Sequence, residues 1–143
     1  MGIDNPLLGA RLQYNIKDNW FVKGFAGVQK NRFQLYNPVI KGLEVSGNIN
    51  VSDNVSIIPG GGALNRTLDQ TSMDLLAANI NAMPEVDDRF VPKFNTFVFV
   101  VYNTLNIKDF SWYVEGATKT SEAINNAQSM LVDKPGNLVY TNL

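Results

Sequence analysis

Hydrophobic and polar residues alternate in long runs along the chain, and the runs come in pairs joined by short polar turns. Residues 8–16 place apolar side chains on one face and polar ones on the other, which is typical of a half-buried β-strand. Residues 20–29 alternate in the same way after the polar turn 17–19. A three-residue loop there sets Ile16 opposite Trp20, so the apolar faces of the two predicted strands coincide.

The same hairpin unit occurs three times, each time around a turn that contains Asp and, in the first two copies, Asn. These residues suit tight turns because their side chains bond nearby backbone groups and tolerate left-handed conformations. The second copy has the loop 52–54, which places Val51 opposite Val55. The third copy has its turn near 108–109 and is followed by a looser second half.

The alternation predicts antiparallel strands that pair in sequence order, at 8–16, 20–29, 42–51, 55–63, 94–106 and 111–119, with a seventh beginning at 137. Gly60, Gly61 and Gly62 predict a bulge, a bend or a strand end. Longer connections separate the hairpins, at 30–38, 65–92 and 120–136. Within the second connection residues 73–80 predict a short helix that ends before Pro84, and within the third a helical turn is predicted around 123–130.

The strand over 94–106 is apolar on both faces, so its orientation has two interpretations. The outward set is Val98, Val100 and Tyr102 in one and Phe97, Phe99 and Val101 in the other. Trp112 and Val114 on the partner strand favour the first set, with Glu115 pointing inward.

Two architectures fit seven antiparallel strands in a meander. A soluble sandwich or barrel turns its apolar face to its own core, whereas a membrane barrel turns it to lipid. The predicted strands are long enough for tilted membrane strands, which need about 9 to 11 residues. Tight turns at one end and long loops at the other match the two ends of bacterial outer-membrane barrels. These features favour an open, partial outer-membrane-type β-barrel of all-β class, formed by residues 1–143 as one segment.

The register places a continuous apolar band on the outer, convex face, made of Leu12, Tyr14, Val22, Val28, Leu43, Val45 and Ile49. Trp20 and Trp112 lie near tight turns, at the level expected for an interfacial aromatic belt. Candidate lumen-facing residues lie on the opposite, polar faces of the strands: Arg11, Gln13, Lys23, Glu44, Asn48 and Glu115. Glu44 with Arg11 or Lys23 predicts either an ion-pair network that fills the interior or a lining that selects a solute.

Composition restricts the chemistry of the chain. Its 143 residues carry a formal net charge of -1 and contain no Cys and no His. Disulfides, Cys or His metal sites, thiol nucleophiles and Ser-His relays are therefore excluded. The charge gives no basic field for nucleic acid, so no nucleic-acid partner is expected. We expect no catalytic, cofactor-binding or metal-binding residues, and no enzymatic activity.

The run from Gly9 to Lys30, the run from Tyr113 to Thr120 and the stretch from Lys134 to Asn137 carry a family resemblance. They resemble strands of an uncharacterised family of Bacteroidota outer-membrane β-barrel proteins. The resemblance covers most of the chain and consists of strand patterns, so it carries over no catalytic or binding residue. Barrels of this kind are longer and begin with a signal peptide, which the first residues here lack. The resemblance therefore implies a segment of a longer barrel.

The sequence thus predicts a structural wall segment of a bacterial outer-membrane barrel, with a role in transport, reception or scaffolding and an undefined solute. Its expected partners are the outer-membrane lipid bilayer and the remaining strands of the same barrel. The alternative is a soluble β-rich module that binds carbohydrate or attaches to a surface. A barrel enzyme is a third class, limited to carboxylate or Ser-Lys chemistry.

Overall fold

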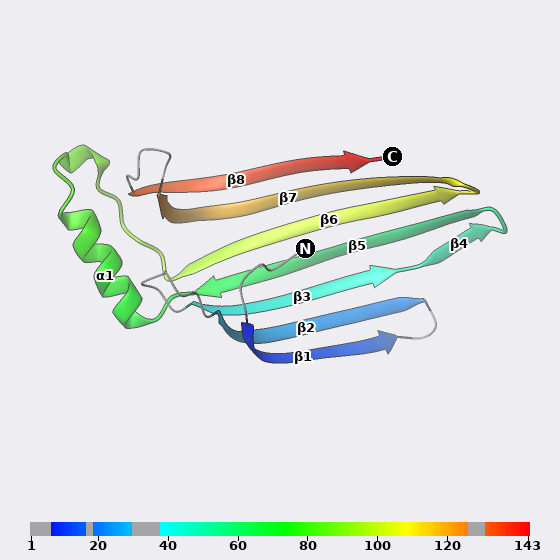
Figure 1. The fold of residues 1–143 in the computed structure, drawn as a ribbon, viewed down its shortest axis with the longest axis horizontal. Coiled ribbons are helices and arrows are strands. Elements are labelled where there is room, and N and C mark those ends of the chain that lie inside the picture. Colours follow the sequence, from blue (N-terminus) through cyan, green and yellow to red (C-terminus); the bar gives the residue numbers. More distant parts are fainter. Residues whose placement is uncertain (1–6, 17–18, 30–37, 126–130) are drawn as a thin grey trace.

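The computed structural model describes residues 7–16, 19–29, 38–125 and 131–143. These residues form one open antiparallel sheet in meander order and one α-helix (Figure 1). The strands are β1 (Leu7–Ile16), β2 (Trp20–Gln29), β3 (Val39–Gly47), β4 (Ile49–Ser52), β5 (Val55–Thr67), β6 (Asn95–Ile107), β7 (Phe110–Asn125) and β8 (Leu131–Asn142). The predicted all-β meander is therefore confirmed. The loop predicted over 30–38 lies outside the described residues except for Pro38.

The sequence predicted one continuous strand over 42–51, but this strand is interrupted and forms two segments, β3 and β4. Both segments pair with β5 in one register, Ser46 with Gly60 and Ile49 with Ile57. The pairing with β5 is therefore missing at Gly47 and Asn48, which lie opposite Pro59 and Ile58. Proline has no backbone N–H to donate to a sheet, which accounts for a break at this point in an otherwise regular ladder.

The hairpin turns set the registers of the three strand pairs. In the first hairpin Ile16 pairs with Trp20, as the predicted three-residue loop requires. In the second, Ser52 pairs with Val55 across a two-residue turn, and a register shift between Asn50 and Ser52 restores the predicted register further along β4. The predicted loop 52–54 is therefore one residue too long.

The third hairpin decides which face of β6 points outward. Ile107 pairs with Phe110 across a two-residue turn, in which Lys108 adopts a positive φ of 52°. Leu105 then pairs with Trp112, so odd-numbered residues of β6 share a face with even-numbered residues of β7. The outward set on β6 is Phe97, Phe99 and Val101, and the favoured set of Val98, Val100 and Tyr102 was wrong. The error followed from an unsettled turn length, because a one-residue change in pairing exchanges the two faces of a strand.

Three strands, β5, β7 and β8, extend well beyond their predicted bounds. β5 continues through Gly60–Gly62 to Thr67 without a bulge, so the glycines lie inside the strand rather than at its end. β7 continues to Asn125, and β8 begins at Leu131, within the stretch predicted as the loop 120–136. A bulge between Lys119 and Glu122 breaks the alternation that would have revealed this extension. Of the helical turn predicted around 123–130, residues 123–125 are strand and the rest lies outside the described residues.

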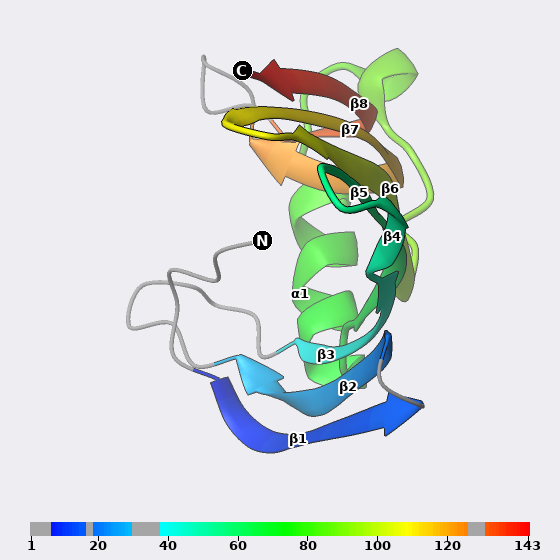
Figure 2. The ribbon, with the colours of Figure 1, turned by 90° about the vertical axis from the view of Figure 1, so that its right-hand side faces the viewer.

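The sheet curves into a trough with one convex and one concave face (Figure 2). The convex face carries the predicted apolar band, of which Val22 is half-buried and the other six side chains are exposed. Leu12 is 80% exposed, Val101 68% and Val139 84%. One row of directly paired residues crosses the whole face: Tyr14, Val22, Val45, Gly61, Val101, Gly116 and Val139. In the described part of the chain no second layer covers this face.

The one α-helix of the described residues, α1 (Gln70–Asn81), confirms the helix predicted over 73–80. It lies beyond the loop ends of β3 and β5 (Figure 1), so in the view along the strands it stands across the end of the trough (Figure 2). The most buried apolar side chains among the described residues are Ile40 at the start of β3 and three helix residues, Met73, Leu76 and Ile80. The most buried apolar side chains are thus found at this end of the molecule. No described helix is long and apolar enough to cross a membrane.

The outermost strands each have one neighbour among the described strands: β1 pairs with β2, and β8 pairs with β7. The sheet does not close on itself, as predicted. Both outer strands are long, at 10 and 12 residues, so they present extended rows of backbone donors and acceptors.

The N-cap of α1 makes helix stability sensitive to pH. Asp69 accepts a 2.7 Å hydrogen bond from the Ser72 backbone N–H, and bonds from Ser72 lower the pKa of Asp69 below its usual 3.8. A lowered folded-state pKa stabilises the helix above the unfolded pKa, and this contribution is lost as pH falls through the folded value. We expect the hydrogen-exchange protection of the Ser72 amide to fall below about pH 4. Asp69→Asn keeps a capping side chain that does not titrate and should remove this pH dependence; equal pH profiles for both proteins would contradict the assignment.

Candidate functional site

The concave face of the sheet contains a hollow of about 530 Å³. Four of the predicted lumen-facing residues line it: Arg11 on β1, Lys23 on β2, Glu44 on β3 and Glu115 on β7. Gln13 pairs directly with Lys23 and shares its face, although it lies outside the lining of the hollow. Asn48 lies in the interruption between β3 and β4, where its backbone N–H donates to the Asn19 carbonyl. The alternation of the strands thus brings together two cations and two carboxylates from four strands.

Glu44 connects the two sides of the hollow. It pairs directly with Lys23 across β2 and β3, with Lys23 Nζ 3.7 Å from Glu44 Oε1. The same oxygen accepts a 2.6 Å hydrogen bond from the Tyr102 hydroxyl on β6. Both members of the ion pair are about one-third exposed, and such cross-strand pairs contribute about 0.2–1 kcal/mol. The short hydrogen bond therefore fixes the Tyr102 ring more firmly than the ion pair fixes Lys23.

Three tyrosines form a ladder across β6, β7 and β8. The ring centroids of Tyr102 and Tyr113 are 6.1 Å apart, and those of Tyr113 and Tyr140 are 6.0 Å apart. The Tyr113 hydroxyl donates a 2.5 Å hydrogen bond to Glu115 Oε2. These tyrosines were not among the predicted site residues, because Tyr102 was expected on the outward face. A two-residue turn at Lys108 would have placed Tyr102 beside Glu115 on the inner face.

Glycines lie beneath two aromatic rings of the concave face. A Cβ atom on Gly60 would lie 2.3 Å from Cζ of Tyr102, and one on Gly42 would lie 2.3 Å from Cε1 of Phe25. In both cases the glycine and the aromatic residue are direct cross-strand partners. Each ring therefore lies over the glycine of the neighbouring strand, in space that the side chain of any larger residue at that position would occupy.

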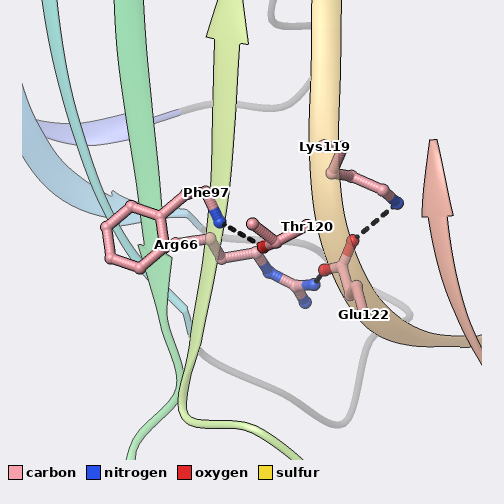
Figure 3. Close-up of polar contacts among 5 residues, drawn as sticks. All are labelled: Arg66, Phe97, Lys119, Thr120 and Glu122. Carbon is pink, nitrogen blue, oxygen red and sulfur yellow. Dashed lines mark hydrogen bonds and ion pairs between the residues drawn. The ribbon is translucent and has the colours of Figure 1, made fainter. Parts of the chain in front are cut away.

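A second charged cluster lies at the loop end of the concave face (Figure 3). Glu122 forms ion pairs with Arg66 on β5 and with Lys119, whose Nζ is 3.0 Å from Glu122 Oε2. The Glu122 side chain is 13% exposed. Lys119 and Glu122 share a face because of the bulge between them; regular alternation would place residues three apart on opposite faces. The bulge also lets the Thr120 hydroxyl accept a 2.9 Å hydrogen bond from the Phe97 N–H.

The two tryptophans lie on the convex face near the tight-turn end. Trp20 is 40% exposed and packs on Gly47, and Trp112 is 41% exposed and donates from Nε1 to the Thr141 hydroxyl at 2.8 Å. The registers place Trp20 level with Pro59 of β5, through Gly47, and Trp112 level with Ile57 of β5, through Leu105. These two positions of β5 are two residues apart, so the tryptophans differ in height by about 7 Å along the strands. Among the described residues no group of three or more acidic side chains is arranged to hold a metal ion.

These features define an open, curved, antiparallel sheet with an apolar convex face and a charged, aromatic concave face. Over residues 1–143 the chain matches the model of a family described as a family of unknown function, DUF6029, and it belongs to that family. No curated protein and no solved structure matches the chain.

The loop-end cluster predicts a specific loss of stability. Glu122→Ala leaves Arg66 and Lys119 without their shared carboxylate, and we expect it to lower the free energy of unfolding by about 1–3 kcal/mol. The exposed residue Glu85, just before the short 3-10 helix Val86–Asp88, provides a control in the same chain. Glu85→Ala should change the free energy of unfolding by less than about 0.5 kcal/mol. Urea unfolding measures both values, and equal effects would contradict a stabilising role for the cluster.

Proposed function

We propose that this chain is a structural wall segment of a bacterial outer-membrane β-barrel protein, with its convex face against lipid and its concave face toward a lumen. The observation that carries the proposal is the convex face itself, where large apolar side chains such as Leu12, Val101 and Val139 are exposed across the whole sheet. A surface of this extent is unfavourable in water, because each exposed apolar side chain forfeits about 1.5–3 kcal/mol relative to burial.

The dimensions of the apolar face support a membrane location. On β6 the outward apolar side chains extend from Phe97 to Ile107, with Asn103 as the polar exception. Ten residue steps span about 33 Å along a strand. At the strand tilt of about 40° that is usual in such barrels, this corresponds to about 25 Å along the membrane normal, the usual height of an apolar band.

The opposite faces and ends of the sheet support the same proposal. Ion pairs and hydrogen-bonded tyrosines lie on the concave face, as polar residues do inside membrane barrels. Short turns join strands at one end, and α1 lies in a long connection at the other (Figure 1). This asymmetry matches periplasmic turns and extracellular loops. The open outer strands β1 and β8 would pair with the remaining strands of the barrel, because backbone groups in lipid require partners.

The proposed role is that of a barrel wall in transport, reception or scaffolding, and not that of an enzyme. Trp20 and Trp112 are the two tryptophans of the chain and would lie in the lipid interface. Refolded into phosphatidylcholine vesicles, the chain should show tryptophan fluorescence that is quenched by brominated lipids. Lipids brominated near the headgroups should quench more strongly than lipids brominated near the chain ends.

A pair of adjacent valines provides the matched test of orientation. Val101 lies on the convex face, and Val100 lines the concave hollow. Val101→Arg should destabilise the vesicle-bound protein by about 2–4 kcal/mol, as expected for Arg on the lipid face near the bilayer midplane. Val100→Arg should have a smaller effect, because its side chain enters the polar interior. Urea unfolding of the vesicle-bound variants measures both.

The alternative, a soluble β-rich binding module, makes the opposite predictions. A chain that stays folded and monomeric in buffer without detergent, and whose tryptophans brominated lipids do not quench, would refute the membrane proposal. Equal destabilisation by both arginine variants would refute the proposed orientation.

A further inference from the structure

The concave hollow combines flat aromatic surfaces with charged groups that balance one another. Its two cations, Arg11 and Lys23, match its two carboxylates, Glu44 and Glu115, so the four side chains carry no net charge. A lining with one dominant sign would attract ions of the other sign. A balanced lining favours instead a ligand that is polar and uncharged.

The aromatic side chains of the hollow are arranged as a platform. Tyr102 and Phe25 lie across glycines of the neighbouring strands, at positions where a Cβ atom would collide with the rings. Both residues line the hollow, so part of each ring borders the space that a ligand would enter. Tyr113 extends the platform from Tyr102 with a centroid separation of 6.1 Å.

The hydrogen bonds of the tyrosines leave acceptors available. The Tyr102 and Tyr113 hydroxyls donate to Glu44 and Glu115, and Ser46 also hydrogen-bonds Tyr102. The Tyr113 oxygen therefore keeps two lone pairs for a further donor and the Tyr102 oxygen keeps one. Ionised carboxylates accept several hydrogen bonds, and Arg11 and Lys23 donate. A pyranose ring presents an apolar C–H face that packs on an aromatic ring, together with hydroxyl groups at its rim that both donate and accept.

We propose that this hollow binds a neutral oligosaccharide, with sugar rings on Tyr102, Tyr113 and Phe25 and sugar hydroxyls on the surrounding charged side chains. The inference rests on the proposed function insofar as it takes the concave face as the lumen of the barrel, and it names the class of solute. Phe25 and Tyr102 are three strands and two pleat repeats apart, about 14 Å across the strands and about 13 Å along them before curvature is considered. A ligand that contacts both rings is therefore extended, with several sugar units. A volume of about 530 Å³ is within the usual range for ligand sites.

The test is calorimetric titration of the full chain with two neutral probes, cellotetraose and maltotetraose. The detergent must be zwitterionic and free of sugar headgroups, since a maltoside would compete for the site. We expect at least one probe to bind with a Kd of about 1 mM or lower. Tyr102→Ala should weaken binding at least about tenfold, the scale of one lost aromatic stacking contact. Tyr102→Phe, which keeps the ring and loses the bond to Glu44, should weaken it less than about threefold.

Two further variants separate stacking from a general loss of structure. Gly60→Ala introduces a Cβ against the Tyr102 ring and should weaken binding while the circular dichroism spectrum is retained. Tyr14→Ala removes an exposed tyrosine from the convex face and should leave binding unchanged. Lack of binding by both probes at about 10 mM, a concentration above any useful affinity, would overturn the proposal. Equal losses in Tyr14→Ala and Tyr102→Ala would also overturn it.

Lipid quenching on the same samples distinguishes the two proposals. If the tryptophans are quenched and neither sugar binds, the membrane proposal stands and the oligosaccharide proposal is refuted. Sugar binding by a detergent-free, unquenched chain would keep the binding site and refute the membrane location.

Discussion

The antiparallel register is the constraint on which the rest of this structure depends. Side chains alternate with a period of two, so a shift of one residue in any strand pair would move apolar side chains to the concave face and charges to the convex face. The register is set at the tight turns: Ile16 faces Trp20, Ser52 faces Val55 and Ile107 faces Phe110. Within each hairpin these turns decide which side chains share a face. The meeting of Lys23 with Glu44 and the apolar row through Val101 depend also on the registers between hairpins, of β2 with β3, β5 with β6 and β7 with β8.

The parts of the fold that depend on local alternation could be predicted from the sequence. The first two strands, their register and the helix behind Asp69 follow from patterns that neighbouring residues determine. The orientation of β6 could not be predicted, because the strand is apolar on both faces and only the length of the turn at Lys108 decides between them. The extension of β7 was missed because the bulge before Glu122 interrupts the alternation of polar and apolar residues. The bulge places Glu122 on the same face as Lys119 and Arg66, and these ion pairs are visible only in the folded structure.

Of the candidate site, the charged residues could be predicted from the sequence and the aromatic residues could not. Its charged residues, Arg11, Lys23, Glu44 and Glu115, were selected because they fall on the polar faces of their strands. The aromatic part was not, since Tyr102 and Phe25 resemble ordinary apolar strand residues in sequence. Their arrangement depends on Gly60 and Gly42, which are 42 and 17 residues away along the chain and become direct neighbours only through pairing. Because these glycines have no Cβ atom, the large aromatic rings can lie flat against the concave surface of the sheet.

The number of antiparallel strands in this sheet limits how the sheet can be closed into a cylinder. When β3 and β4 are counted as one strand, the described residues form seven antiparallel strands in a row. The first and the last of these, β1 and β8, therefore run in the same direction (Figure 1). Direct union of these two edges would create a parallel seam in an otherwise antiparallel cylinder. A seam-free antiparallel cylinder requires an odd number of intervening strands, whatever chain supplies them, and its total is then even. This sheet therefore determines that the strands completing a seam-free antiparallel cylinder are odd in number.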